Sequence, residues 1–110
     1  MSVQHKDLAQ GRWKTMPLLE QMANIGSEVE RALNWRVKQN AAYSQKAFER
    51  ALDLMDIALE SHLDLARLKE LTRVREAMVD YFCGTNQFMS TETSWRKYFS
   101  NFIFAARRNY

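Results

Sequence analysis

The sequence predicts an all-α fold: an up-down-up-down antiparallel four-helix bundle, residues 15–110, with a short polar N-terminal arm, residues 1–14. Three observations indicate this fold. The chain of 110 residues has one proline and three glycines, too few for the many tight turns of an all-β fold. Apolar residues recur at helical spacing in four segments of about 18 to 24 residues. The connections between these segments are short, which makes successive helices antiparallel neighbours around one core.

The first predicted helix follows the arm. Residues 1–14 are polar and poorly patterned, so we expect them to be a loose arm. Thr15 is the expected N-cap and Pro17 lies in the first turn, where its missing N–H costs nothing. The helix is expected to end near Gln39. Its apolar stripe consists of Leu18, Met22, Ile25, Val29, Ala32 and Leu33. Gly26 lies beside this stripe and would let a neighbouring helix approach closely.

The second predicted helix runs from Ala41 to about Ser61, with Asn40 as its N-cap. Its wide apolar face consists of Ala47, Phe48, Ala51, Leu52, Leu54, Met55, Ala58 and Leu59. Ile57 lies off this face. An acidic ridge runs along the helix at spacings of i, i+4, i+7 and i+11, and consists of Glu49, Asp53, Asp56 and Glu60. This ridge is expected to be solvated, or to meet a basic surface.

The third predicted helix spans residues 65–82, with Asp64 as its N-cap and Gly84 as a left-handed C-terminal cap. Arg75 falls within its apolar arc. A guanidinium near a core must find an acidic or carbonyl partner, and Glu28, at the edge of the first helix's stripe, is the candidate. We therefore expect a buried ion pair between Arg75 and Glu28.

The last helix, within residues 94–110, has the strongest amphipathic pattern. Residues 85–89 form the longest loop, and Ser90 is the expected cap. One arc is aromatic and apolar: Trp95, Tyr98, Phe99, Phe102, Ile103, Ala105 and Ala106. A helix with so much aromatic surface must be covered by the other helices.

The outer face of this last helix is the best candidate binding surface. The net charge of the chain is +3, and from Thr91 onward four cations stand against one carboxylate, a surplus equal to the whole excess. The candidate residues are Arg96, Lys97, Phe104, Arg107 and Arg108. Cations beside an exposed aromatic ring can bind an acidic protein, or nucleic-acid phosphates with a stacked base. They can equally form a solubilising surface.

Three large apolar residues on different helices lie off their stripes: Trp35, Ile57 and Phe104. Such residues on a small bundle indicate buried contacts beyond the four-helix core. Homo-oligomerisation is the simplest explanation, since it requires no other partner. These three residues are the predicted subunit contacts.

No motif for catalysis, cofactor or metal binding is found in the sequence. The carboxylates Glu28, Glu76 and Asp80 are similar in type to those of the MazG-type helical nucleotide pyrophosphohydrolases, which hold Mg²⁺ on packed helices. That family pairs adjacent glutamates with a Glu-x-x-Asp, whereas this chain has Glu28-x-Glu30 and Glu76-x-x-x-Asp80. A solvated face with i, i+4 pairs explains Glu76 and Asp80. The histidines lack companions at zinc-ligand spacing, and the Arg-x4–6-His motif of HEPN-class ribonucleases is absent.

Several function classes are therefore disfavoured. The single cysteine, Cys83, cannot form an internal disulfide, and we expect it to be an inert packing residue. The sequence has no apolar secretory segment and no run long enough to span a membrane. The predicted function is a cytoplasmic, self-associating interaction module without catalysis, cofactor or metal. A nucleic-acid-binding module is the alternative, and a MazG-like hydrolase is a third hypothesis.

Overall fold

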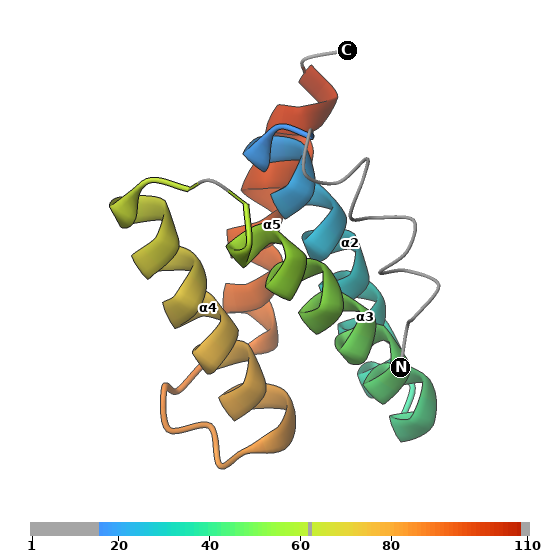
Figure 1. The fold of residues 1–110 in the computed structure, drawn as a ribbon. Helices are drawn as coiled ribbons and strands as arrows, with labels where there is room; N and C mark the ends of the chain where they lie inside the picture. Colours follow the sequence, from blue (N-terminus) through green and yellow to red (C-terminus); the bar gives the residue numbers. More distant parts are fainter. Residues whose placement is uncertain (1–15, 62, 109–110) are drawn as a thin grey trace.

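The structure, a computed structural model, describes residues 16–61 and 63–108 and is all-α over these residues. It contains α2 (Leu18–Val37), α3 (Ala41–Leu59), α4 (Leu65–Cys83) and α5 (Glu92–Arg108), and no strand within the described residues. In Figure 1, α2 and α3 run side by side and α4 stands at the edge of the molecule. The predicted arm and the Thr15 cap lie outside the described residues. The contacts between helices are consistent with a bundle, and the up-down-up-down order stays a prediction.

Side-chain caps explain where α3, α4 and α5 begin. The side chain of Asn40 accepts a hydrogen bond from the Tyr43 N–H at 3.0 Å, and that of Asp64 accepts one from the Arg67 N–H at 2.8 Å. Each satisfies an N–H that would otherwise lack a partner in the first turn. Both predicted caps are therefore confirmed.

Two predicted caps are wrong. The side chain that caps α5 is Thr91, whose Oγ1 accepts from the Ser94 N–H at 3.0 Å, while Ser94 Oγ accepts from the Thr91 N–H at 2.9 Å. This reciprocal pair displaces Ser90, whose N–H donates to Asn86 Oδ1 instead. Gly84 has extended backbone, with φ −105° and ψ −154°, rather than a left-handed conformation.

The core lies between α2, α3 and α5, and the most extensive helix contacts are those of α2 with α3 and of α2 with α5. The close approach predicted at Gly26 is confirmed, because a Cβ built there would lie 2.8 Å from the Cβ of Phe99 on α5. Only a residue without a side chain lets the two helices pack at this distance. The aromatic arc of α5 turns into this core, with Trp95 and Phe99 both buried.

The buried arc of α3 is wider than the sequence pattern predicted. Ile57 was expected outside the apolar face, but it is fully buried at 0% exposure. The physical reason is that α3 packs against both α2 and α4, so two sides of the helix are covered. The prediction that Ile57 is off the core is therefore wrong.

The α4 helix is the least buried of the four. Only Leu71 and Met78 on this helix are buried, and its main helix contact is with α3. Cys83 at its end is exposed, so the expectation that it packs in the interior is wrong.

Candidate functional site

One cation of the predicted basic face of α5, Arg96, forms ion pairs within the chain. Arg96 lies 2.9 Å from Glu92 through its Nε and 3.5 Å from Glu30 of α2 through Nη1, and its Nη2 donates to Asn34 Oδ1 at 2.8 Å. The contacts with Glu30 and Asn34 join α5 to α2. Arg96 is therefore a structural residue rather than a free cation.

The remaining members of this face are exposed. Lys97, Arg107 and Arg108 are all open to solvent, and Phe104 is 64% exposed. The Arg108 guanidinium carbon lies 5.8 Å from the centre of the Phe104 ring, a cation–π geometry. This reduced set is free to contact a partner.

The predicted ion pair between Arg75 and Glu28 is wrong. Arg75 Nε lies 2.6 Å from Asp56 Oδ1, which ties α4 to α3. The reason is that α4 packs mainly against α3, which brings Arg75 to the acidic ridge of that helix. Glu28 is buried, as expected, but it binds Arg50 at 3.2 Å and Arg31 at 3.3 Å.

The three predicted subunit contacts do not share a surface. Ile57 is inside the chain. Trp35 is half-buried and makes an edge-to-face contact with Tyr43 of α3, with ring centres 4.8 Å apart. On α5, Arg96 contacts Asn34 near the C-terminal end of α2, and Phe99 lies against Gly26 nearer its middle. Phe104 follows Phe99 along α5 and lies still farther from the C-terminal end of α2. Trp35 and Phe104 therefore lie towards opposite ends of α2.

The structure instead gathers exposed apolar side chains on α4 and the loop that follows it. The most exposed are Leu65 at 65%, Leu68 at 38%, Phe88 at 53% and Met89 at 83%. A hollow of about 430 Å³ is lined by Leu68, Lys69, Thr72, Arg73, Glu76 and Phe88. We call these exposed apolar residues and the residues lining the hollow the α4 flank.

The loop that carries Phe88 is held in place by side chains. Asp80 Oδ1 accepts from the Gln87 N–H at 2.8 Å, and its Oδ2 accepts from the Phe88 N–H at 2.9 Å. Asn86, with φ of 59°, exchanges hydrogen bonds with the backbone of Ser90 through both side-chain atoms. The sequence signal for this surface is the adjacent apolar pair Phe88 and Met89 within a predicted loop.

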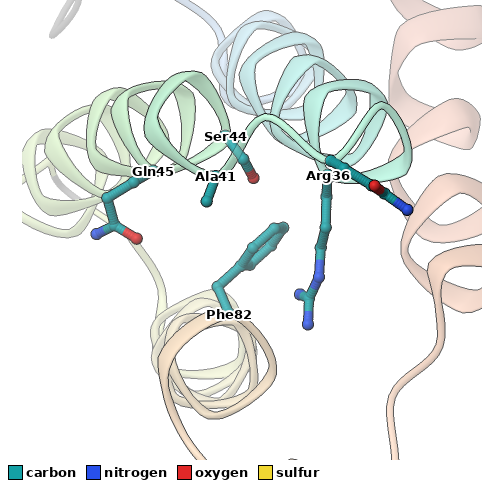
Figure 2. Close-up of a pocket in the computed structure, with 6 residues that line it drawn as sticks. Arg36, Ala41, Ser44, Gln45 and Phe82 are labelled. Atoms are coloured by element: carbon teal, nitrogen blue, oxygen red, sulfur yellow. The ribbon is translucent and has the colours of Figure 1, made fainter.

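A second hollow, of about 250 Å³, lies where α2, α3 and α4 meet (Figure 2). Arg36 and Phe82 project into it from two helices. The Arg36 guanidinium carbon lies 4.6 Å from the centre of the Tyr81 ring and 5.5 Å from that of Phe82. Ser44 Oγ donates to the Ala32 carbonyl at 2.8 Å. Arg36 and Ser44 thus make contacts between helices: Arg36 joins α2 to α4, and Ser44 joins α3 to α2.

Tyr98 links α5 to α4. Its hydroxyl donates to Glu70 Oε2 at 2.8 Å. Burial of the phenol, together with this hydrogen bond, raises the pKa of Tyr98 above its ordinary value. The phenol is thus neutral at physiological pH and acts as a hydrogen-bond donor.

The three carboxylates of the third hypothesis do not form one cluster, because Glu76 and Asp80 lie one turn apart on α4 whereas Glu28 lies on α2. Glu28 binds two arginines, Asp80 holds the loop, and Glu76 lines the α4 hollow. Within residues 16–61 and 63–108, no group of three or more His, Cys, Asp or Glu side chains could hold a metal ion. Among the described helices, none has the length and apolar character needed to cross a membrane. Comparison of the chain with family models, curated proteins and solved structures found no match.

Proposed function

We propose that this protein is a non-catalytic interaction module that self-associates through the α4 flank. The observation that carries the proposal is the concentration of exposed apolar side chains, Leu65, Leu68, Phe88 and Met89, on the least buried helix and its loop. Covering such a surface removes apolar area from water, which is the main driving force for association.

The charge pattern along α4 favours a second copy as the occupant. Lys69, Thr72, Arg73 and Glu76 line one side of the helix at spacings of three and four residues. If two copies of α4 pack antiparallel about a two-fold axis between Thr72 and Arg73, Lys69 of each copy lies opposite Glu76 of the other. Lys69 and Glu76 are thus complementary across the axis, as a two-fold interface requires, and Arg73 of each copy lies opposite Thr72 of the other.

The proposal also covers the helix directions, the N-terminal residues, the compartment and catalysis. We take the helices to alternate in direction, residues 1–14 to form an arm, and the module to act in the cytoplasm, where its exposed Cys83 stays reduced. The proposal takes the module to be non-catalytic; Glu28 is paired with Arg31 and Arg50, and Asp80 accepts hydrogen bonds from the loop that follows α4.

Light scattering coupled to size-exclusion chromatography tests this proposal. The wild-type chain is expected to be a dimer, and Phe88→Asp to be a monomer. Phe104→Asp is the matched control, because it places the same charge at an equally exposed phenylalanine on another helix. A monomeric wild type, or dissociation by Phe104→Asp but not by Phe88→Asp, contradicts the proposal.

A charge exchange tests the pairing of the two helices. Lys69→Glu places like charges opposite each other at both ends of the interface and is expected to raise the dimer Kd by about 5- to 10-fold. The double variant Lys69→Glu, Glu76→Lys restores opposite charges and is expected to recover most of the affinity. If the double variant is as weak as the single variant, the antiparallel arrangement is wrong.

A further inference from the structure

The corner between α2 and α3 is rich in positive charge. From Arg31 to Phe48 the sequence contains four cations and no aspartate or glutamate. The cations are Arg31, Arg36, Lys38 and Lys46. Since α2 ends at Val37 and α3 begins at Ala41, these cations lie on both sides of the short turn that joins the two helices.

Cations and aromatic rings form two adjoining stripes on the outer side of this corner. The first stripe is Arg31 and Trp35 of α2 with Lys38 at its C-cap, and the second is Tyr43, Lys46 and Arg50 of α3. Spacings of three, four and seven residues place each set on one helix face. The two helices run side by side, as Figure 1 shows, and the Trp35–Tyr43 contact joins the stripes. We call these six residues the α2–α3 seam.

The lysines of the seam lie against its aromatic rings. Lys38 Nζ is 5.1 Å from the centre of the Trp35 ring, and Lys46 Nζ is 5.8 Å from that of Tyr43. Both lysines are exposed, and neither has a carboxylate partner among the residues the structure describes. Tyr43 is 49% exposed, so part of its ring is open to a ligand.

The carboxylates nearest to the seam do not cancel its charge. Glu28 lies between Arg31 and Arg50, so this group of three carries a net positive charge. Glu49, one turn from Lys46 on α3, accepts a hydrogen bond from Gln45 Nε2 at 3.3 Å. The four cations of the seam outnumber these two carboxylates, so the surface keeps a surplus of positive charge.

We propose that the α2–α3 seam binds single-stranded nucleic acid. Lys38 and Lys46 contact successive phosphates, and a base stacks on the open part of the Tyr43 ring. This combination of a positively charged track and an aromatic platform is what sequence-tolerant single-strand binding requires. A duplex keeps its bases stacked on one another, so it can use the lysines but not the ring. The site is separate from the α4 flank and does not depend on dimer formation.

Fluorescence anisotropy with a fluorescein-labelled, mixed-sequence single strand of about 20 nucleotides tests this site. We expect the wild-type chain to bind, with a Kd that rises about 7-fold between about 50 and 200 mM NaCl, as the two phosphate contacts of Lys38 and Lys46 predict. The same sequence as a duplex is expected to bind several-fold more weakly.

Two double variants locate the site. Lys38→Glu with Lys46→Glu is expected to weaken binding at least about 30-fold. The matched control, Arg107→Glu with Arg108→Glu, makes the same change in net charge on the exposed end of α5 and is expected to change the Kd less than about 3-fold. Tyr43→Ala leaves the charge unchanged and is expected to weaken binding about 5- to 10-fold by removing the stacked ring.

Three outcomes would overturn the proposal: no binding by the wild-type chain at low salt, equal losses in the two double variants, or a loss confined to the α5 variant. Equal losses would indicate attraction by net charge alone, and the third outcome would assign binding to the basic face of α5. Circular dichroism checks that each variant stays helical. If the seam variant unfolds, Lys38→Gln with Lys46→Gln replaces it, with Arg107→Gln and Arg108→Gln as its control.

Discussion

The core of α2, α3 and α5 and the flanking helix α4 are held by different forces. Among the described residues, every buried hydrophobic side chain except Leu71 and Met78 belongs to the three core helices. The α4 helix packs partly buried apolar side chains against this core, and the Arg75–Asp56 ion pair and the Tyr98–Glu70 hydrogen bond add to them. Its Phe82 ring also stacks on that of Phe48, with ring centres 4.7 Å apart.

This difference indicates where the molecule is most easily opened. Apolar burial stabilises a helix in proportion to the area removed from water, whereas half-exposed polar contacts contribute little each. Regions with few buried apolar contacts open first, in sub-global steps. The helix with the weakest apolar anchoring is also the one that exposes apolar residues for a partner, so α4 is suited to binding rather than to holding the fold.

The largest expected contrast compares a buried core residue with an exposed residue of α4. Ile57→Ala should lower the free energy of unfolding by about 2 to 5 kcal/mol, because it removes a fully buried side chain and leaves a cavity. Leu65→Ala, at a site 65% exposed, should change it by less than about 0.5 kcal/mol. Urea unfolding at concentrations where the chain is monomeric measures both. Equal losses would show that the two regions do not differ.

The close approach of α2 and α5 gives the next effect. In Gly26→Ala the new Cβ would overlap with Phe99, and we expect a net loss of about 1 to 2 kcal/mol even though alanine is the better helix former. Ser27→Ala, on the exposed side of the same turn, is the control and should stay within about 0.5 kcal/mol of wild type. A stabilised Gly26→Ala protein would mean that α5 is free to move away from α2.

Tyr98 is expected to control how tightly α4 is attached. Tyr98→Phe removes the hydrogen bond to Glu70 and should cost about 0.5 to 1.5 kcal/mol. Hydrogen exchange should show faster exchange of the α4 amides, with the α2 amides nearly unchanged. An equal increase in both helices would mean that α4 opens only with the whole molecule.

The raised pKa of Tyr98 predicts a dependence on alkaline pH. Its folded-state pKa lies above the unfolded value of about 10, so the phenol's contribution is fully present below pH 10 and is lost as the pH rises from there towards the folded-state pKa. Stability should therefore fall more steeply above about pH 10 in the wild-type chain than in Tyr98→Phe. Parallel pH profiles from chemical denaturation would contradict this.

The smallest effect is expected for the ion pair between α4 and α3. Both side chains are about a third or more exposed, at 35% for Arg75 and 43% for Asp56. A double-mutant cycle with Arg75→Met and Asp56→Asn should give a coupling of about 0.2 to 1 kcal/mol. A coupling of several kcal/mol would mean that α4 is anchored by charge.

The sequence predicted the parts of the fold that depend on neighbours along the chain. Asn40 and Asp64 were identified as caps because a cap bonds an N–H only a few residues away. The prediction that Ser90 caps α5 was wrong for a local reason too. The next residue, Thr91, is also a good N-cap and forms reciprocal hydrogen bonds with Ser94. The close packing at Gly26 was predicted from its place beside an apolar stripe, although its partner, Phe99, was not.

The candidate sites were harder to predict because they depend on how the helices pack. Arg75 was given the wrong partner because the sequence does not say whether α4 lies against α2 or α3. Arg96 was taken for a free cation because Glu30 and Asn34, which lie on a distant helix, could not be matched to it. The α2–α3 seam was missed because its two stripes become one surface only when the helices lie side by side.

The sequence alone determined that the described chain is helical, roughly where each helix begins and ends, and which stripe of α2 and of α5 is apolar. These features depend on periodicity and on hydrogen bonds between residues a few positions apart, which any helical segment reveals. Tertiary structure decided that Ile57 is buried, that Glu28 and Arg75 bind different partners and that α4 exposes an apolar flank. Burial and pairing across helices depend on which faces meet, and that choice is made only when the whole core packs.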